Sequence, residues 1–242
     1  MKVLFLSEYF PPNSKGGGER SAYKLARALV KKGVTVHVLT SHFSGPHIQI
    51  VDDIKIFRYL KTAENPGNVL KRWLIFERSL LRETEKLHEE EKYDVIHCKN
   101  SSSVYAVKLK EKLNVRFVMH INSYALLCPK GTMIYHDQTI RRECFNKCSS
   151  FYEFFGCLAG SKLVGINEMP WYHKFNPLVS TILWWRYKQH LSLLKQFDKI
   201  IPISKITKRH CIGRGLDEKK MTVIYPIRDI DGTLLSTMSK HL

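Results

Sequence analysis

The chain alternates short apolar runs with longer segments of helical periodicity, and no other feature of the sequence constrains the fold as strongly. Continuous apolar runs of strand length lie at 2–7, 34–41, 54–60, 93–98, 115–120, 197–204 and 220–226. Segments with apolar residues at helical spacing lie between them at 22–30, 69–90 and 101–113, and a further helix is expected from Ser204. Such alternation favours right-handed crossovers, which place helices on both faces of a parallel sheet. The sequence therefore predicts an α/β fold with a doubly wound, mainly parallel sheet.

This alternation is interrupted once within the 242 residues. Residues 121–177 do not continue it, and they contain four of the six cysteines. We expect one domain over 1–226 with a cysteine-containing insertion at about 121–177, followed by a tail or the start of a linker at 227–242. The N-terminal apolar run is too short for a signal peptide, which favours a cytoplasmic protein. No apolar stretch approaches the roughly 20 residues that a membrane-spanning helix needs.

The chain is strongly basic, with 39 Lys and Arg against 22 Asp and Glu and a formal net charge of +17. Its field favours an anionic partner, such as a phosphate ligand, an anionic lipid surface or nucleic acid. The basic residues are dispersed and no zinc-finger, RRM or KH pattern occurs, so we do not expect a nucleic-acid partner. Residues 177–197 mix Trp184 and Trp185 with Lys and Arg. This mixture suits a helix at a membrane surface or a helix that packs in the core.

Three consecutive glycines, Gly16–Gly18, join the first expected strand to the first expected helix. Backbone N–H groups at a helix start bind anions, and glycine allows a close approach. The alternative is a flexible loop that needs positive φ. The chain lacks G-x-x-x-x-G-K-[ST], which argues against a P-loop nucleotide hydrolase. The triplet is not G-x-G-x-x-G, and Thr40–His42 stand where a dehydrogenase has an acid for the ribose, so a dehydrogenase is disfavoured.

Ligands of doubly wound sheets bind beyond the carboxyl ends of the strands. The segments expected at this edge are Ser7–Phe10, Thr40–His42, His97–Lys99 and His120–Asn122. The imidazole of His120 could hydrogen-bond a ligand hydroxyl or handle a proton there, or it could be a structural histidine.

Residues 1–40 resemble the opening of the family-4 retaining glycosyltransferases of the GT-B fold, in which a strand, a proline-containing loop, a Gly-Gly pair and a helix precede a second strand. Three later segments are similar to that family in the same order: "YDVIHCKNSSSVYAV", "VRFVMHINSYALLCP" and "KIIPISKITKRHCIGRGLDEKKMTVIYP". The resemblance implies the Rossmann-like N-terminal half of a GT-B fold. It also implies hexosyl transfer, with retention, from a nucleotide-diphosphate sugar to a lipid-linked or saccharide acceptor in glycan biosynthesis.

The same resemblance implies a substrate nucleotide sugar, no cofactor and no divalent metal. In the family, a donor domain follows the segment that matches "VIYP", whereas this chain ends at Leu242. We therefore expect the acceptor-binding domain of a cytoplasmic transferase that is inactive without a donor domain or partner chain and that can bind peripherally at an anionic membrane. The alternative is a non-catalytic binding module for anionic lipid or polysaccharide.

The resemblance also assigns roles to individual residues. It makes His120 the catalytic residue beside the transferred sugar and Gly16–Gly18 the site of the donor diphosphate. It places five residues on the acceptor side: Tyr9, Glu8, Arg20, His97 and Asn122. Tyr9 could stack on a sugar ring or pack the loop, and Arg20 could pair with phosphate or be solvated. Glu8 is expected to cap or orient the loop, and His97 could instead be structural.

Four cysteines fall within 30 residues, in the pattern C-x15-C-x3-C-x8-C: Cys128, Cys144, Cys148 and Cys157. The gap between the second and third is allowed in zinc sites, but the whole pattern matches no familiar zinc signature. Structural zinc, a disulfide staple and free buried thiols therefore stay open, with free thiols favoured in a reducing cytosol. None of the four is expected to be a nucleophile.

Overall fold

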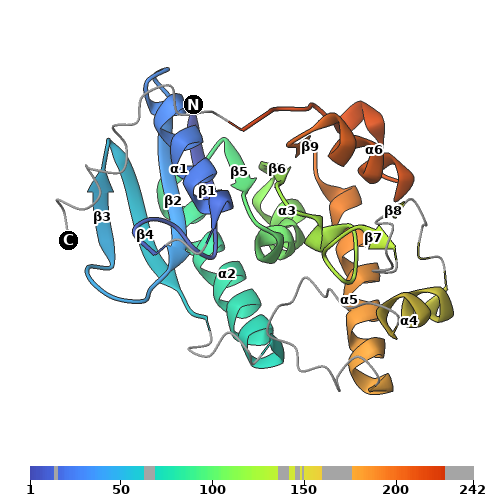
Figure 1. Ribbon diagram of the computed structural model, residues 1–242. Helices are drawn as coiled ribbons and strands as arrows, with labels where there is room; N and C mark the ends of the chain where they lie inside the picture. The colour runs from blue at the N-terminus through green and yellow to red at the C-terminus, as the bar shows by residue number, and fades with distance from the viewer. Residues whose placement is uncertain are drawn as a thin grey trace.

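The computed structural model describes residues 1–13, 16–62, 69–135, 142–144, 148, 150–159 and 176–226. Its centre is a seven-stranded sheet with the order β3-β4-β2-β1-β5-β6-β9 (Figure 1). Every neighbouring pair is parallel except β3 and β4. The strands are β1 (Lys2–Leu6), β2 (Thr35–Ser41), β3 (Ile48–Val51), β4 (Ile54–Leu60), β5 (Val95–Cys98), β6 (Arg116–Ile121) and β9 (Lys199–Pro202). The predicted α/β, mainly parallel sheet is confirmed.

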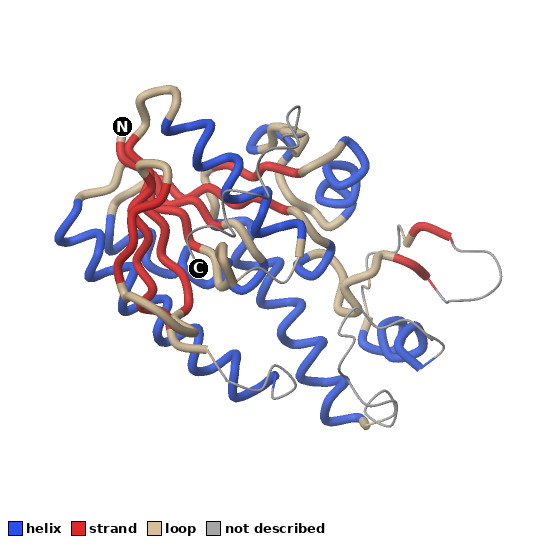
Figure 2. Tube along the Cα trace, turned by 60° about the vertical axis from the view of Figure 1, so that its left-hand side comes forward, coloured by secondary structure: helices blue, strands red, loops and turns tan. Residues whose placement is uncertain are grey.

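Helices lie on both sides of this sheet, as the tube view shows (Figure 2). Val3 and Phe5 of β1 join an apolar cluster with α1, whereas Leu4 and Leu6 join a larger cluster with α2, a 3₁₀ helix η1 and α5. Successive side chains of a strand point to opposite faces, so a buried central strand needs both coverings and reads as a continuous apolar run. The helices are α1 (Gly17–Val30), α2 (Val69–Glu91), η1 (Ser101–Leu109), α3 (Lys110–Leu113), α4 (Phe151–Ala159), α5 (Pro177–Gln196) and α6 (Lys205–Gly213).

Two local expectations about secondary structure were wrong, and one strand was missed. The antiparallel strand β3 was not expected, and it pairs with β4 through a tight turn at Asp52 and Asp53, both at positive φ. The helix expected at 101–113 is mainly 3₁₀, with only α3 in the α form. The strand expected at 220–226 is reduced to one parallel bridge between Ile200 and Met221.

The expected insertion contains short elements at one end of the molecule (Figure 2). Its described parts include η2 (Tyr124–Leu126), a small hairpin of β7 (Ile134–Tyr135) with β8 (Arg142–Glu143), and helix α4. Phe154 of α4 stacks on Trp184 of α5, with ring centroids 5.6 Å apart. The α4 helix is therefore attached to the domain through α5. The tail expected at 227–242 lies outside the described residues.

Helix α5 packs in the core along one side and exposes apolar residues on the other. Asn176 caps its start by accepting from the Leu178 N–H, and Leu194 is fully buried. Leu178 and Trp185 are exposed, although Trp185 also meets Trp73 of α2 edge to face. Both interpretations of residues 177–197 thus have a physical basis. Within the part of the chain that the structure describes, every helix is too short or too polar to span a bilayer.

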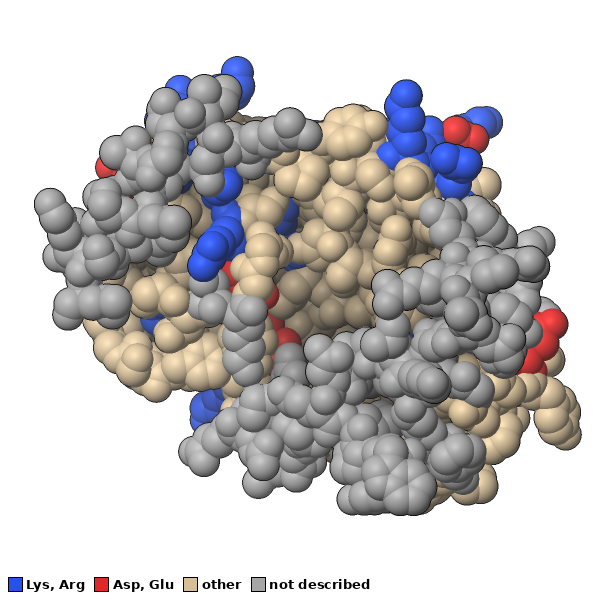
Figure 3. Space-filling view, in the orientation of Figure 1, with Lys and Arg blue, Asp and Glu red and all other residues tan. Residues whose placement is uncertain are grey.

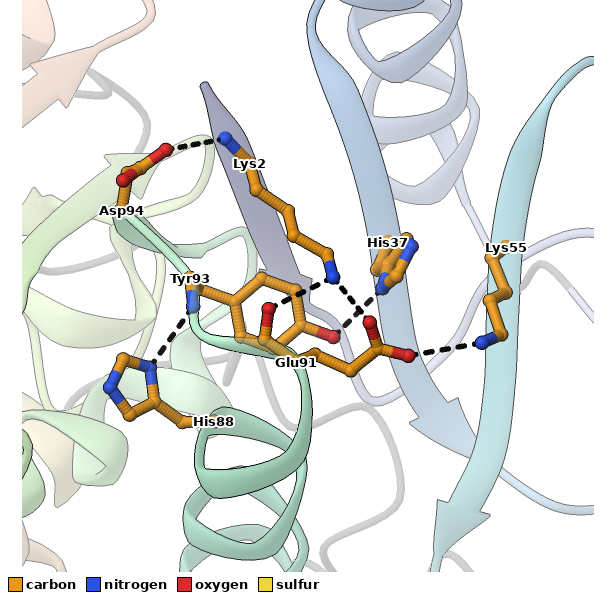
Figure 4. Close-up of polar contacts among 7 residues, drawn as sticks. All are labelled: Lys2, His37, Lys55, His88, Glu91, Tyr93 and Asp94. Carbon is orange, nitrogen blue, oxygen red and sulfur yellow. Dashed lines mark hydrogen bonds and ion pairs between the residues drawn. The ribbon is translucent and has the colours of Figure 1, made fainter.

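At the amino ends of the strands, a group of charged and polar side chains ties α2 to the sheet (Figure 4). Glu91 at the end of α2 receives hydrogen bonds from Lys2 of β1 and from Lys55 of β4, the latter at 3.0 Å. These two bonds lower the pKa of Glu91 to about 2. Behind them, His37 Nδ1 lies 2.9 Å from the Tyr93 hydroxyl, and burial lowers the pKa of His37 to about 4. These contacts hold α2 against the amino ends of the strands, so the carboxyl ends of the strands remain available to ligands.

Candidate functional site

The three glycines open helix α1, and the structure gives each a different environment. The Gly16 N–H donates to Glu19 Oε2 at 2.9 Å, so this amide already has a partner. A Cβ on Gly17 would meet nothing within 4 Å. A Cβ on Gly18 would lie 2.9 Å from Asn122 Nδ2, closer than real Cβ contacts. The Asn122 amide, which follows β6, would therefore have to move to admit a side chain at Gly18, and Gly17 is left open to a ligand.

The Asn122 side chain is held by the backbone of a neighbouring strand end. Its Nδ2 donates to the Lys99 carbonyl at 3.0 Å, directly after β5. We predict that Gly18→Ala displaces this amide and breaks the bond, making Gly18→Ala about 1–2 kcal/mol less stable than Gly17→Ala. Gly17→Ala is the matched control, because it adds the same methyl group to the same helix turn in open space and gains helix propensity. Urea unfolding of both variants measures the difference.

A double-mutant cycle separates this clash from a general loss of backbone freedom. In an Asn122→Ala background the obstructing amide is gone, so Gly18→Ala is expected to cost nothing. If the cost of Gly18→Ala persists in that background, the close approach of Asn122 is not its cause.

The side chains at the ends of β5 and β6 form a buried cluster of two imidazoles and an ammonium group. Lys99 Nζ lies 2.9 Å from His120 Nδ1, and only 1% of Lys99 and 5% of His120 are exposed. The rings of His97 and His120 are nearly parallel, with centroids 5.7 Å apart. His97 Nε2 is buried without a hydrogen-bond partner among the described residues. The structure thus brings the predicted His97, His120 and Asn122 together around Lys99.

Burial shifts the ionisation of all three basic groups toward the neutral form. It lowers the pKa of Lys99 to about 7. Burial and the nearby Lys99 lower the pKa of His120 to about 3, and burial also lowers the pKa of His97 well below its ordinary value. At neutral pH both imidazoles are therefore uncharged and able to act as directed hydrogen-bonding groups.

Glu8 joins three segments behind the glycine loop. Its carboxylate accepts from Thr62 Oγ1 at 3.0 Å and from Ser102 Oγ at 2.7 Å, while its backbone carbonyl accepts from Thr40 Oγ1. The residue is 2% exposed. Glu8 has the orienting contacts expected of it, and these buried contacts favour that role over direct contact with an acceptor.

Tyr9 and Arg20 differ in their exposure to solvent. Tyr9 is buried and stacks on Phe43, with centroids 5.4 Å apart and planes 9° apart. The structure therefore favours the packing interpretation of Tyr9 over stacking on a sugar. Arg20 is exposed on α1, where either solvation or a phosphate is open to it.

The sequence analysis placed Lys99 in a segment at this edge but gave it no role, and it did not single out Thr62 or Ser102. A lysine is usually solvated, and nothing near positions 62 or 102 marks a partner for a residue in the first strand. For Lys99, the available signal was its place directly after a buried strand, at the edge where ligands bind.

The cysteines are all free and buried. Cys144 and Cys148 are hydrogen-bonded to one another, and this bond and burial raise the pKa of the Cys148 thiol. Arg214 Nη2 lies 4.0 Å from Cys144 Sγ, and Cys157 lies in α4. Among the residues that the structure describes, no group of three or more His, Cys, Asp or Glu is arranged to hold a metal ion.

The face seen in Figure 1 is hollowed near its centre in the space-filling view, and basic side chains gather at two places beside the hollow (Figure 3). The gathering at the upper right lies over α6, whose sequence contains Lys205, Lys208 and Arg209. A neutral, hydrogen-bonding cluster with basic surroundings suits a polar ligand that carries negative charge.

This chain is similar to known glycosyltransferases. The family model for Glycosyltransferase Family 4 matches residues 15–231. An uncharacterized glycosyltransferase of Methanocaldococcus jannaschii is 25% identical over 124 residues, which are 51% of this chain and 31% of that protein. The chain thus spans less than a third of this curated relative.

Solved structures of GT-B glycosyltransferases share the fold. Anabaena HepE in complex with UDP-glucose matches with a TM-score of 0.51 and 14% identity, over 100% of this chain and 49% of HepE. Sucrose-phosphate synthase from Thermosynechococcus elongatus matches with a TM-score of 0.56 and 13% identity, over 93% of this chain and 47% of the synthase. Starch Synthase IV from Arabidopsis thaliana, bound to ADP and acarbose, matches with a TM-score of 0.51 and 12% identity, over 93% of this chain and 51% of its catalytic domain. This chain has the fold of about half of such an enzyme and, by the extent of the family match, it belongs to Glycosyltransferase Family 4.

Proposed function

We propose that this chain is the acceptor-binding, N-terminal half of a retaining glycosyltransferase. It moves a hexosyl group from a nucleotide-diphosphate sugar to a lipid-linked or saccharide acceptor. The observation that carries the proposal is the meeting of Gly18, Asn122, Lys99 and His120 at the carboxyl edge of the sheet, within a chain of this family. HepE and Starch Synthase IV, whose structures contain UDP-glucose or ADP, support a nucleotide sugar as the substrate class.

Each group at this edge has a task in that reaction. The open backbone at Gly17, at the positive end of α1, binds a phosphate oxygen of the donor. His120 hydrogen-bonds a sugar hydroxyl beside the anomeric carbon. Glu8, which is hydrogen-bonded to Thr62 and Ser102, holds the glycine loop in position relative to the donor phosphate and the sugar hydroxyl.

The chemical step is a front-side attack with retention. The acceptor oxygen bonds to the anomeric carbon as the bond from that carbon to the diphosphate oxygen breaks. The departing diphosphate oxygen takes the acceptor proton. Backbone dipoles and basic side chains stabilise the leaving group, so the reaction needs no divalent metal.

Two further partners belong to this proposal. A donor domain, in the same protein or in a partner chain, supplies the remaining contacts to the nucleotide. An anionic membrane surface presents a lipid-linked acceptor, which is supported by the net charge of +17 and by the exposed Leu178 and Trp185 of α5.

A reconstitution assay tests the proposal. The chain is mixed with pooled UDP-, GDP- and ADP-sugars and a membrane extract, with and without the donor domain of its own enzyme or of a family-4 relative. We expect transfer only when the donor domain is present. Transfer by the 242-residue chain alone would contradict the need for a donor domain. Silence in both mixtures, with binding to anionic vesicles retained, would support a non-catalytic binding module instead.

A further inference from the structure

The contact between Lys99 and His120 constrains the protons of both groups. Lys99 Nζ reaches His120 Nδ1 at 2.9 Å inside the domain. Among the described residues, Lys99 has no carboxylate at ion-pair distance, so the imidazole is its polar side-chain partner. A buried ammonium group held by an imidazole in place of an acid is costly, which indicates a purpose other than stability.

The direction of this hydrogen bond follows from the chemistry of the two groups. An ammonium group has only donors and no acceptor. When Lys99 carries its proton, His120 Nδ1 must therefore accept, and the proton of a neutral imidazole must sit on Nε2. The pKa of Lys99 is lowered to about 7 and that of His120 to about 3, so this arrangement holds at pH values between them.

We propose that Lys99 is a positioning residue that holds His120 in the Nε2–H tautomer, so that His120 offers a hydrogen-bond donor, and not a base, to a ligand oxygen. The inference rests on the proposed function for the identity of that ligand, a sugar or phosphate oxygen. With Nδ1 engaged by Lys99 and Nε2 already protonated, His120 has no free lone pair to take a proton from an acceptor hydroxyl.

The surroundings of the pair support a fixed ring. His97 stacks on His120 from β5, and Asn122 binds the Lys99 carbonyl from the loop after β6. The nearby titratable side chain at the end of β1 is Glu8, whose carboxylate is engaged by Thr62 and Ser102. Burial and the charge of Lys99 both act on His120 in the direction that keeps it neutral.

Histidine nitrogen NMR tests the tautomer directly. The chain is labelled with ¹⁵N at its histidines, and the His120 signals are assigned by their loss in His120→Gln. At pH 5.5 we expect Nε2 to carry a hydrogen and Nδ1 to carry none. An Nδ1–H tautomer, or a charged imidazolium at this pH, would overturn the proposal.

Substitutions of Lys99 test its part in this state. In Lys99→Met the pKa of His120 is expected to rise by about one unit or more, and the preference for Nε2–H is expected to weaken. Lys99→Arg keeps a donor without a lone pair, so it should retain the Nε2–H form. The buried His190, which bonds to Tyr105, is the internal reference and should not change. Lys108→Met, which removes a lysine paired with Glu77, is the matched control.

These readouts do not depend on sugar transfer. An unchanged His120 in Lys99→Met would refute the positioning role even if the reconstituted enzyme is active. Conversely, the expected tautomer in a protein that transfers no sugar would leave the positioning role intact and reject the proposed function.

Discussion

Replacing His120 by alanine in the chain reconstituted with its donor domain is expected to lower sugar transfer by about 100-fold or more. A preorganised donor at a reacting centre is worth about 10²–10³ in rate, because it needs no reorganisation as charge develops. His120 has this character: it is 5% exposed, neutral at pH 7, and held by Lys99 and the His97 ring. The measurement is the initial rate of transfer at saturating nucleotide sugar.

The control is His120→Gln, whose amide can place an N–H near the position of Nε2. It should lose less activity than His120→Ala, since one donor remains. Equal unfolding free energies for the two variants would show that the comparison reports on the site. An alanine variant within threefold of the parent rate would remove His120 from the mechanism.

Acid is expected to unfold the domain at about pH 5, well above the range in which carboxylates alone would act. Burial lowers the pKa of four imidazoles: to about 4 at His37, to about 3 at His120 and His190, and well below the ordinary value at His97. Each pKa is lower in the folded than in the unfolded chain, so the unfolded chain takes up protons first as the pH falls below 6.5. Stability from these groups is complete above pH 6.5 and is lost progressively as the pH falls toward 3.

The size of this loss is large compared with the stability of a domain. The lowered pKa values of His37, His120 and His190 are each worth about 3 kcal/mol or more, so these three groups remove on the order of 10 kcal/mol. A typical domain has only about 5–15 kcal/mol in total. The Glu91 bonds to Lys2 and Lys55 add a loss at lower pH, because a carboxyl with a pKa of about 2 contributes stability above pH 4.5 and loses it as the pH falls toward 2.

Urea unfolding at a series of pH values measures the effect as the slope of the free energy of unfolding against pH. Removing one buried imidazole, as in His37→Gln, should reduce the slope between pH 6.5 and 5 by about 1.4 kcal/mol per pH unit. His47→Gln is the matched control, because it makes the same change at an exposed imidazole. A free energy of unfolding that stays level from pH 6.5 to 4.5 would contradict the prediction.

The strands that are buried on both faces could be predicted from the sequence, and the exposed ones could not. The runs at 2–7, 34–41 and 115–120 became β1, β2 and β6 because a covered parallel strand is apolar throughout. Strand β3 was not predicted from the sequence, because Ile48 and Ile50 face solvent. Its Asp52-Asp53 turn also lacks the glycine that usually marks a hairpin.

The grouping of residues at the candidate site could be predicted from the sequence, but the contacts between them could not. Strand ends placed His97, His120 and Asn122 at one edge, since carboxyl ends of parallel strands meet there. Nothing in the sequence indicates that Gly18 is small because of Asn122, a residue more than a hundred positions away. The same holds for Lys99, whose burial depends on how β5 sits between β1 and β6.

We expect the hydrogen bonds of Glu8 with Thr62 and Ser102 to form only late in folding. Thr62 and Ser102 lie 54 and 94 positions from Glu8, so both contacts require long loops to be closed after their strands have docked. Such closure carries an entropy cost that a local helix does not pay, and topologies of this kind form slowly. A partly folded chain that has formed α1 and α2 therefore still lacks the candidate site, so we expect ligand binding to appear only when folding is complete.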